Sequence, residues 1–252
     1  MPDFFLLHDY ICLVNVVIDM GNTLTKVATF QNSTFLNLQT CSAKEVNSLL
    51  ASLKFDMGLI CSVKEDVYST YVLEQNSSIL KLEHGLQLPI DNTYSTPKSL
   101  GFDRLSNVIG AFTIEPNTNS LIIDAGTCLK FDFIDAENRY LGGAISPGLA
   151  MRLESLHNFT DKLPLVELKK PNKLIGDSTI QSIRSGVVHG MIAEINNLID
   201  LYHKKYSSLK VFITGGDLDF IYPMVDNQKS SIFAHNYITL LGMHTILQEN
   251  VS

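Results

Sequence analysis

One arrangement of apolar and polar residues occurs near the start of each half of the chain. In the first copy, an apolar run at residues 16–18 ends in Asp19, passes through Gly-Asn-Thr at residues 21–23, and alternates between apolar and polar residues up to residue 30. An unbroken β-branched run and a period-two alternation are both typical of strands, and Gly-Asn is a common turn pair. The pattern therefore predicts a strand, a tight turn and a second strand.

The turn of this hairpin carries groups that suit an anion. Gly21 tolerates a positive φ and lets backbone N–H groups approach a bound phosphate. Asn22, Thr23 and Thr25 add side-chain donors, and Asp19 can hold Mg²⁺ through water. For a single turn of this kind, an ordinary hairpin with a polar tip is the simpler interpretation.

A second copy favours the phosphate interpretation. Residues 121–133 again give an apolar run, then Asp124, Gly126 and Thr127, and then an alternation. Two acid-tipped hairpins in a duplicated chain indicate two related domains that hold one phosphate chain between them. The arrangement resembles that of the acetate and sugar kinase, Hsp70 and actin superfamily.

The remaining pattern fits two lobes with a common order of elements. In the first half we expect strands at 35–38, 56–63 and 80–82, and helices at 44–50 and 66–75. In the second half we expect strands at 121–124, 128–134, 139–145 and 210–214, and a long helix at 178–206. The expected fold class is α/β, with two ribonuclease-H-like lobes built as duplicated βββαβα units. Turn formers at residues 115–120 divide the lobes into residues 1–115 and 116–252.

Composition and charge narrow the function. The net charge of −7 and the lack of a Lys/Arg-rich run argue against nucleic-acid binding. The four cysteines show no metal-ligand spacing, which favours reduced thiols in the cytoplasm. Residues 1–12 form an apolar extension that contains no Lys or Arg, whereas a signal peptide begins with a positively charged region. We therefore expect no membrane or export role. The extension should be dispensable.

Further candidate residues lie between and after the two hairpins. Residues 94–105 contain Tyr94, Pro97 and the sequence Gly-Phe-Asp-Arg, followed by a helix expected at 105–112. Asp103 is therefore either a reactive carboxylate or a charge that favours the start of that helix. Close-approach glycines occur at 142–148 and 215–216, and a hydroxyl near residue 178 either caps the long helix or contacts a ligand.

Taken in order, these segments resemble the type III pantothenate kinases. The motifs are Asp-x-Gly-Asn-Thr at 19–23, Gly-x-Asp-Arg at 101–104, Asp-x-Gly-Thr at 124–127, Gly-Gly-x-Ile-x-Pro-Gly at 142–148, Leu-Pro at 163–164, a helix-opening Thr179, and Thr-Gly-Gly at 214–216. Each motif is weak by itself, but the ordered set is specific and covers the chain from about Leu13 to the last helix near Gly242.

The resemblance implies an activity and a set of site residues. The enzyme would transfer the γ-phosphoryl group of ATP to the 4′-hydroxyl of pantothenate, which opens coenzyme A synthesis. Asp103 would be the catalytic base, Asp124 would hold a monovalent cation (K⁺ or NH₄⁺), and Asp19 would hold Mg²⁺ through water. The implied ATP-binding residues are Asp19, Met20, Gly21, Asn22, Thr23, Leu24, Thr25, Lys26 and Thr127. The implied pantothenate-binding residues are Tyr94, Gly101, Phe102, Asp103, Arg104 and Thr179.

Arg104 has two interpretations, because a structural ion pair is nearly as reasonable as a contact with the substrate. The resemblance also implies a homodimer in which Thr179 reaches the partner's pocket. An apolar stripe along residues 180–198 is consistent with that interface, but it is equally consistent with burial inside its own lobe.

Three residues depart from the family pattern. Cys128 and Lys130 replace smaller residues beside the second loop, and Phe102 is larger than usual. We expect Cys128 to pack inward, whereas Lys130 lies either near the phosphate path or in solvent.

Two other functions compete with the pantothenate kinase. A sugar kinase is the nearest rival within the superfamily, but no sugar-binding set can be assembled. A regulatory protein on the same fold is the non-enzymatic rival, and retention of Asp19, Asp103, Asp124 and Thr127 argues against it.

Overall fold

The structure is a computed structural model, and it describes residues 13–21, 24–62, 67–226 and 231–251. The chain divides into two compact units: a first unit of Met1–Gln87 with Met243–Ser252, and a second unit of Leu88–Gly242. The expected extension, residues 1–12, lies outside the described residues. The division at residue 115 stays a prediction about domains. That position lies inside the second unit, between α3 (Phe102–Ile114) and β7 (Ser120–Ala125).

The first unit is built on one five-stranded sheet with the order β3-β2-β1-β4-β5. Its elements are β1 (Val14–Met20), β2 (Thr25–Gln31), β3 (Thr34–Cys41), α1 (Val46–Ala51), β4 (Met57–Ser62), α2 (Val67–Gln75) and β5 (Ile79–Lys81). The first three strands are antiparallel, and β1, β4 and β5 are parallel. Val16, Ile18 and Met20 of β1 are buried in one apolar core with side chains from α1 and α2.

The second unit repeats this topology around β7. Its sheet has the order β11-β10-β7-β8-β9-β6, with β7, β8 and β9 antiparallel and β7, β10 and β11 parallel. The strands are β6 (Asp91–Asn92), β7, β8 (Cys128–Ile134), β9 (Arg139–Pro147), β10 (Lys210–Thr214) and β11 (Ser231–Ala234), and the helices are α3, α4 (Leu149–Asn158), α5 (Thr179–Lys205) and α6 (Leu218–Ile221). The duplicated arrangement confirms the predicted ribonuclease-H-like fold class.

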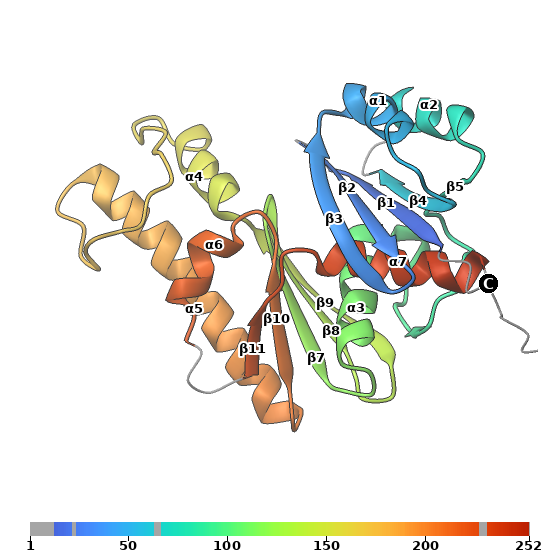
Figure 1. Cartoon of the computed structure of the whole chain (residues 1–252). Coiled ribbons are helices and arrows are strands. Elements are labelled where there is room, and N and C mark those ends of the chain that lie inside the picture. Colours follow the sequence, from blue (N-terminus) through green and yellow to red (C-terminus); the bar gives the residue numbers. More distant parts are fainter. Residues whose placement is uncertain (1–12, 22–23, 63–66, 227–230, 252) are drawn as a thin grey trace, which may run out of the picture. The chain divides into compact units, whose positions relative to one another are not determined.

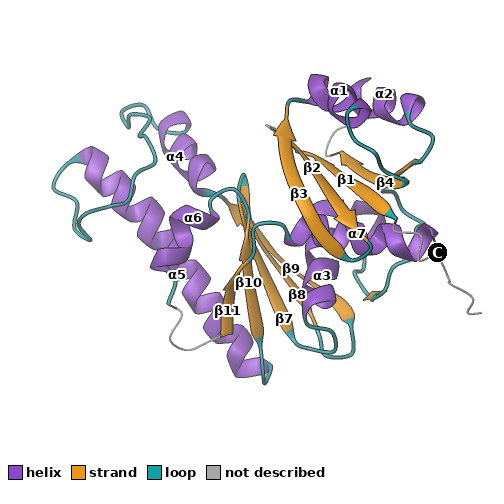
Figure 2. Cartoon of the chain, viewed as in Figure 1, coloured by secondary structure: helices purple, strands orange, loops and turns teal. Residues whose placement is uncertain are grey.

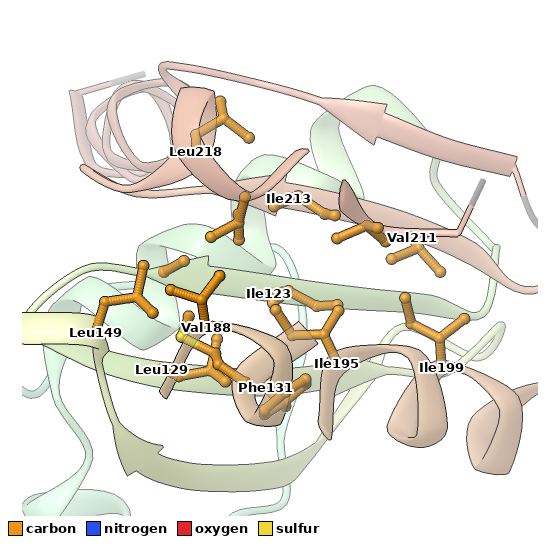
Figure 3. Close-up of a cluster of buried hydrophobic side chains, with 14 of the residues drawn as sticks. Ile123, Leu129, Phe131, Leu149, Val188, Ile195, Ile199, Val211, Ile213 and Leu218 are labelled. Carbon is orange, nitrogen blue, oxygen red and sulfur yellow. The ribbon is translucent and has the colours of Figure 1, made fainter. Parts of the chain in front are cut away.

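Helices cover both faces of the second sheet, with α4 and α5 on one side and α3 on the other (Figures 1 and 2). On the α5 side, side chains from β7, β8 and β10 meet Val188, Ile195 and Ile199 of α5 in one apolar cluster (Figure 3). The apolar stripe of α5 therefore belongs mainly to the core of its own unit, since Met191 and Ile195 are fully buried. Two apolar residues near the ends of α5 are exposed, Ile180 at 45% and Leu201 at 49%.

The last helix, α7 (Ile238–Val251), crosses the division between the units. Its first residues pack on α3, where a Cβ at Gly242 would lie only 1.8 Å from the Ser106 carbonyl oxygen. Its later residues belong to the first unit, where the buried His244 ring stacks on Phe30 at 4.1 Å between centroids. The Nε2 atom of His244 lies 3.3 Å from Nδ2 of Asn15.

We expect His244 to make stability depend on pH. Burial lowers the pKa of His244 from 6.5 to about 4. Between these two pH values His244 binds a proton in the unfolded chain but not in the folded protein. The free energy of unfolding is therefore unaffected by His244 above pH 6.5, and it decreases as the pH drops toward 4. The loss should total about 3 kcal/mol. Urea unfolding followed by circular dichroism at several pH values measures it.

The matched variants are His244→Phe, which keeps an aromatic ring against Phe30, and His157→Gln on the exposed end of α4. The first should flatten the pH dependence and the second should leave it. An unchanged slope in His244→Phe would show that another group is responsible.

Candidate active site

The first hairpin places an acid opposite a lysine. Asp19 is the penultimate residue of β1, and the antiparallel register pairs it with Lys26 of β2. Side chains that face each other across two strands lie on the same side of the sheet, so the carboxylate and the ammonium share one face. The predicted positions Asn22 and Thr23 lie outside the described residues.

The neighbouring predicted ATP residues differ in exposure. Gly21 donates its N–H to the Leu24 carbonyl oxygen at 3.2 Å, which closes the turn. Leu24 is 55% exposed, whereas Met20 and Thr25 are buried. The Met20 side chain belongs to the first unit's core, so any contact of Met20 with a nucleotide would come from its backbone.

The second hairpin repeats the pairing. Asp124 is the penultimate residue of β7, and it stands opposite Lys130 of β8. The turn between them is exposed at Thr127, whose carbonyl oxygen accepts the N–H of Gly148 at 3.1 Å. Cys128 is only partly buried, at the first position of β8, so it packs inward less than expected.

Lys130 joins the two acids that carry the predicted chemistry. Its Nζ lies 2.6 Å from Oδ2 of Asp103 and 2.7 Å from Oδ2 of Asp124. The Lys130 side chain is 16% exposed, which excludes the interpretation that it points to solvent. Burial lowers the pKa of Lys130, but the charges of Asp124 and Asp103 outweigh burial and leave that pKa above its ordinary value.

Asp103 lies inside a helix, whereas the sequence pattern predicted a helix that begins after it. Helix α3 starts at Phe102, because Gly101 takes the extended conformation of an N-cap, and Asp103 falls in the first turn. The backbone N–H groups of this turn lack helical partners, so a carboxylate there is stabilised by the helix dipole. A side chain at position 101 would displace Asp103, since a Cβ there would lie 2.5 Å from its Oδ1.

Two residues outside the sequence motifs, Asn107 and Thr239, fix the position of Asp124. Buried Asn107 of α3 donates from Nδ2 to Oδ2 of Asp124 at 3.2 Å, and the Thr239 hydroxyl of α7 donates to the side-chain oxygen Oδ1 of Asn107 at 2.6 Å. Gly215, with φ of 102°, follows β10 on the other side, where a Cβ would lie 2.6 Å from Oδ1 of Asp124. Only glycine meets both conditions, which explains the first glycine of the Thr-Gly-Gly motif at the end of β10.

Arg104 forms a buried ion pair, which supports the structural interpretation left open by the sequence. Its Nε and one terminal nitrogen donate to Oδ1 of Asp132 at 2.9 and 2.6 Å, and the Tyr140 hydroxyl donates to the same oxygen at 2.6 Å. Burial raises the pKa of Asp132, and Arg104 and Tyr140 partly oppose that rise. Burial also raises the pKa of the Tyr140 phenol, in the same direction as the Asp132 charge.

An aromatic wall lies beside this ion pair. The Tyr94 ring stacks on Tyr140 at 5.9 Å, and the Arg104 guanidinium lies 5.5 Å from the Tyr94 ring centre. Gly142 has φ of 108°, and a Cβ there would lie 3.3 Å from the Tyr94 ring. The structure therefore brings Tyr94 and Arg104 of the predicted substrate set together, and Gly101, half-buried Phe102 and Asp103 adjoin Arg104 along the chain.

Thr179 lies elsewhere in the second unit. Ser178 is the N-cap of α5 and accepts the Gln181 N–H at 3.3 Å, so the cap is not Thr179, which is exposed. Thr179 lines an open groove of about 860 Å³ between α4 and α5 together with Arg152. None of the described residues that line this groove belongs to the other predicted substrate residues, which are Tyr94, Gly101, Phe102, Asp103 and Arg104.

The residues present suit phosphoryl transfer with few metal ligands. Within the described residues, no cluster of three or more His, Cys, Asp or Glu side chains could hold a metal ion. Mg²⁺ keeps several waters and binds through one or two carboxylates plus substrate phosphates. A single carboxylate such as that of Asp19 is therefore enough for a Mg²⁺ site. Asp124, in contrast, already contacts an ammonium and an amide, and it does not fit a further cation at Oδ2.

Within the part of the chain that the structure describes, no helix is both long and apolar enough to cross a membrane.

Comparison with solved structures shows the fold. A Baf family protein from Campylobacter jejuni, titled as a transcriptional activator, aligns with a TM-score of 0.61 at 22% identity, over 93% of this chain and 98% of that one. A glucokinase from an Antarctic psychrotroph aligns with a TM-score of 0.51 at 9% identity, over 93% and 98% of the two chains. Both likenesses support two ribonuclease-H-like lobes.

Comparison with protein families is more specific. The model of the type III pantothenate kinase family matches residues 15–201. A type III pantothenate kinase from Christiangramia forsetii is 41% identical over 246 residues, which cover 94% of this chain and 99% of the relative. One from Flavobacterium johnsoniae is 38% identical over 242 residues, covering 94% and 98%. On this evidence the chain belongs to the type III pantothenate kinase family.

Proposed function

We propose that the protein phosphorylates pantothenate to 4′-phosphopantothenate with ATP, the first step of coenzyme A synthesis. The observation that carries the proposal is its family membership over nearly the whole chain, because relatives bearing that name align along 94% of it. The geometry of the second unit agrees, since Asp103 is fixed at a helix start by an ion pair rather than left as a mobile surface acid.

The proposed roles follow from what phosphoryl transfer requires. Such a reaction depends mainly on positioning and charge neutralisation. The first hairpin, from Asp19 to Lys26, would bind ATP, with Asp19 holding Mg²⁺ through water, and Thr127 would bind ATP from the second hairpin. Asp103 would accept the proton of the pantothenate hydroxyl. Tyr94, Gly101, Phe102 and Arg104 would shape the pocket, with Arg104 fixed by Asp132.

The monovalent cation implied at Asp124 stays a prediction, and the Lys130 ammonium offers a specific alternative to it. The cytoplasm is the proposed compartment, in agreement with free thiols at Cys41, Cys61 and Cys128.

Purified protein should release ADP with MgATP and pantothenate. A coupled assay against a panel of hexoses separates the proposal from a sugar kinase. Turnover with a hexose and none with pantothenate would establish the sugar kinase, whereas no turnover with any acceptor would favour the regulatory protein.

Asp103→Asn should lower kcat far more than it changes the KM for ATP. Asparagine keeps the size and a hydrogen bond, but it cannot take the proton, and general-base help is worth ~10²–10⁴-fold. Steady-state kinetics of this variant measure both constants, and Asp219→Asn, at an exposed position of α6, is the control. A kcat within about threefold of wild type would leave Asp103 as a helix-terminal charge only, because asparagine also suits helix starts.

We also propose a homodimer in which residues 159–180 lie in the interface. Exposed apolar side chains gather in this segment: Phe159 is 88% exposed, Leu174 is 74% exposed and Ile175 is 83% exposed. Surface patches of this kind mark protein contacts. A partner would also explain why Thr179 and Asp103 line different regions of their own chain.

Light scattering at micromolar concentration should show a dimer, and Ile175→Asp should weaken it by placing a charge in the apolar contact. Wild-type protein that remains monomeric would contradict the dimer.

A further inference from the structure

Lys130 occupies the position beside Asp124 where the family resemblance implies a free cation. Its Nζ lies at contact distance from Oδ2 of Asp124, 2.7 Å away, and the same oxygen also accepts Asn107. The Asp124 side chain is only 15% exposed. A free cation at this oxygen would have to displace the ammonium.

Two carboxylates hold the ammonium in the site. It sits between two carboxylates, and both distances are typical of charge-assisted hydrogen bonds. Moving it to solvent would leave Asp103 and Asp124 facing each other without a countercharge, and breaking a partly buried pair in this way is costly. The backbone supports the same geometry, because Lys130 stands directly opposite Asp124 in the β7–β8 register.

A lysine ammonium has the charge and the donor chemistry of NH₄⁺. It carries one positive charge and three N–H donors. Two of these donors already reach the carboxylates that a free cation would neutralise. Because it is covalently attached, its occupancy does not depend on the concentration of any salt.

We propose that Lys130 replaces the monovalent cation of this enzyme, neutralising Asp124 and orienting Asp103, so that activity needs neither K⁺ nor NH₄⁺. The inference rests on the proposed pantothenate kinase activity. Lys130 is a positioning residue in this proposal, since it acts through Asp103 and Asp124. The plain alternative is an ion pair that only joins β8 to α3.

The first test uses wild-type protein with pantothenate and MgATP at one ionic strength. KCl, NH₄Cl, NaCl and tetramethylammonium chloride are compared. The rates should agree within about twofold, because a tethered charge is insensitive to the identity of the salt. A fall of tenfold or more when K⁺ and NH₄⁺ are both removed overturns the inference. Absence of activity in every salt would instead count against the proposed function.

The second test uses Lys130→Thr, which suits a strand and leaves room beside Asp124. Its activity in tetramethylammonium chloride should fall by about 10²-fold, and K⁺ or NH₄⁺ should restore a large part of it. Its melting temperature should also rise with K⁺ while that of wild type does not, because a bound ion stabilises the folded state. Lys210→Thr, on β10 of the same sheet, removes the same charge and should behave as wild type.

The remaining outcomes also decide the matter. A folded Lys130→Thr variant that is inactive in every salt, or as active as wild type without K⁺ and NH₄⁺, overturns the replacement of the cation. If the variant does not fold, the wild-type salt series alone decides whether the replacement holds.

Discussion

The second unit depends on the register between β7 and β8. Three residues separate Ala125 from its partner Leu129, so Asp124 stands opposite Lys130. A two-residue turn at Gly126 and Thr127 would instead pair Asp124 with Leu129 and turn Lys130 to the other face, because a one-residue slip reverses every side chain. The ion pairs of Lys130 with Asp103 and Asp124 therefore depend on the length of this turn.

The two hairpins reach the same pairing by different routes. In the first unit the acid and the lysine are seven residues apart, at Asp19 and Lys26, and in the second they are six apart, at Asp124 and Lys130. Both hairpins therefore place an acid opposite a lysine, although their turns differ in length. In the second unit the lysine also meets an acid from a helix, which gives this hairpin a fixed internal charge.

The pattern of apolar and polar residues predicted most of the fold, because most strands are long or consist of an unbroken apolar run. β8 and β10 match their expected bounds, and α5 differs by one residue at each end. β6 and β11 escaped prediction because strands of two and four residues carry no periodic signal. α4 was missed because a Gly-Pro-rich turn precedes it and its apolar residues are interrupted by polar ones.

The candidate site was predictable where it follows motifs along the chain, and not where it follows contacts across it. The motifs located Asp103, Asp124 and the glycines. They did not indicate that Arg104 pairs with Asp132, 28 residues away in the sequence, or that Asn107 bonds to Thr239, 132 residues away. Such pairings are set by packing of α3 on the sheet and on α7, which no local pattern records. A buried acid within an apolar strand, as at Asp132, is the one signal that would have indicated a partner.

The division of α7 between the two units has a consequence for how the protein is made. The first unit contains the start of the chain, but its core also contains His244, stacked on Phe30. During synthesis, β1 to β5 emerge long before this ring, whereas the second unit is complete in sequence by Gly242. The unit that is translated first therefore completes its core only after the residues of the second unit have been synthesised.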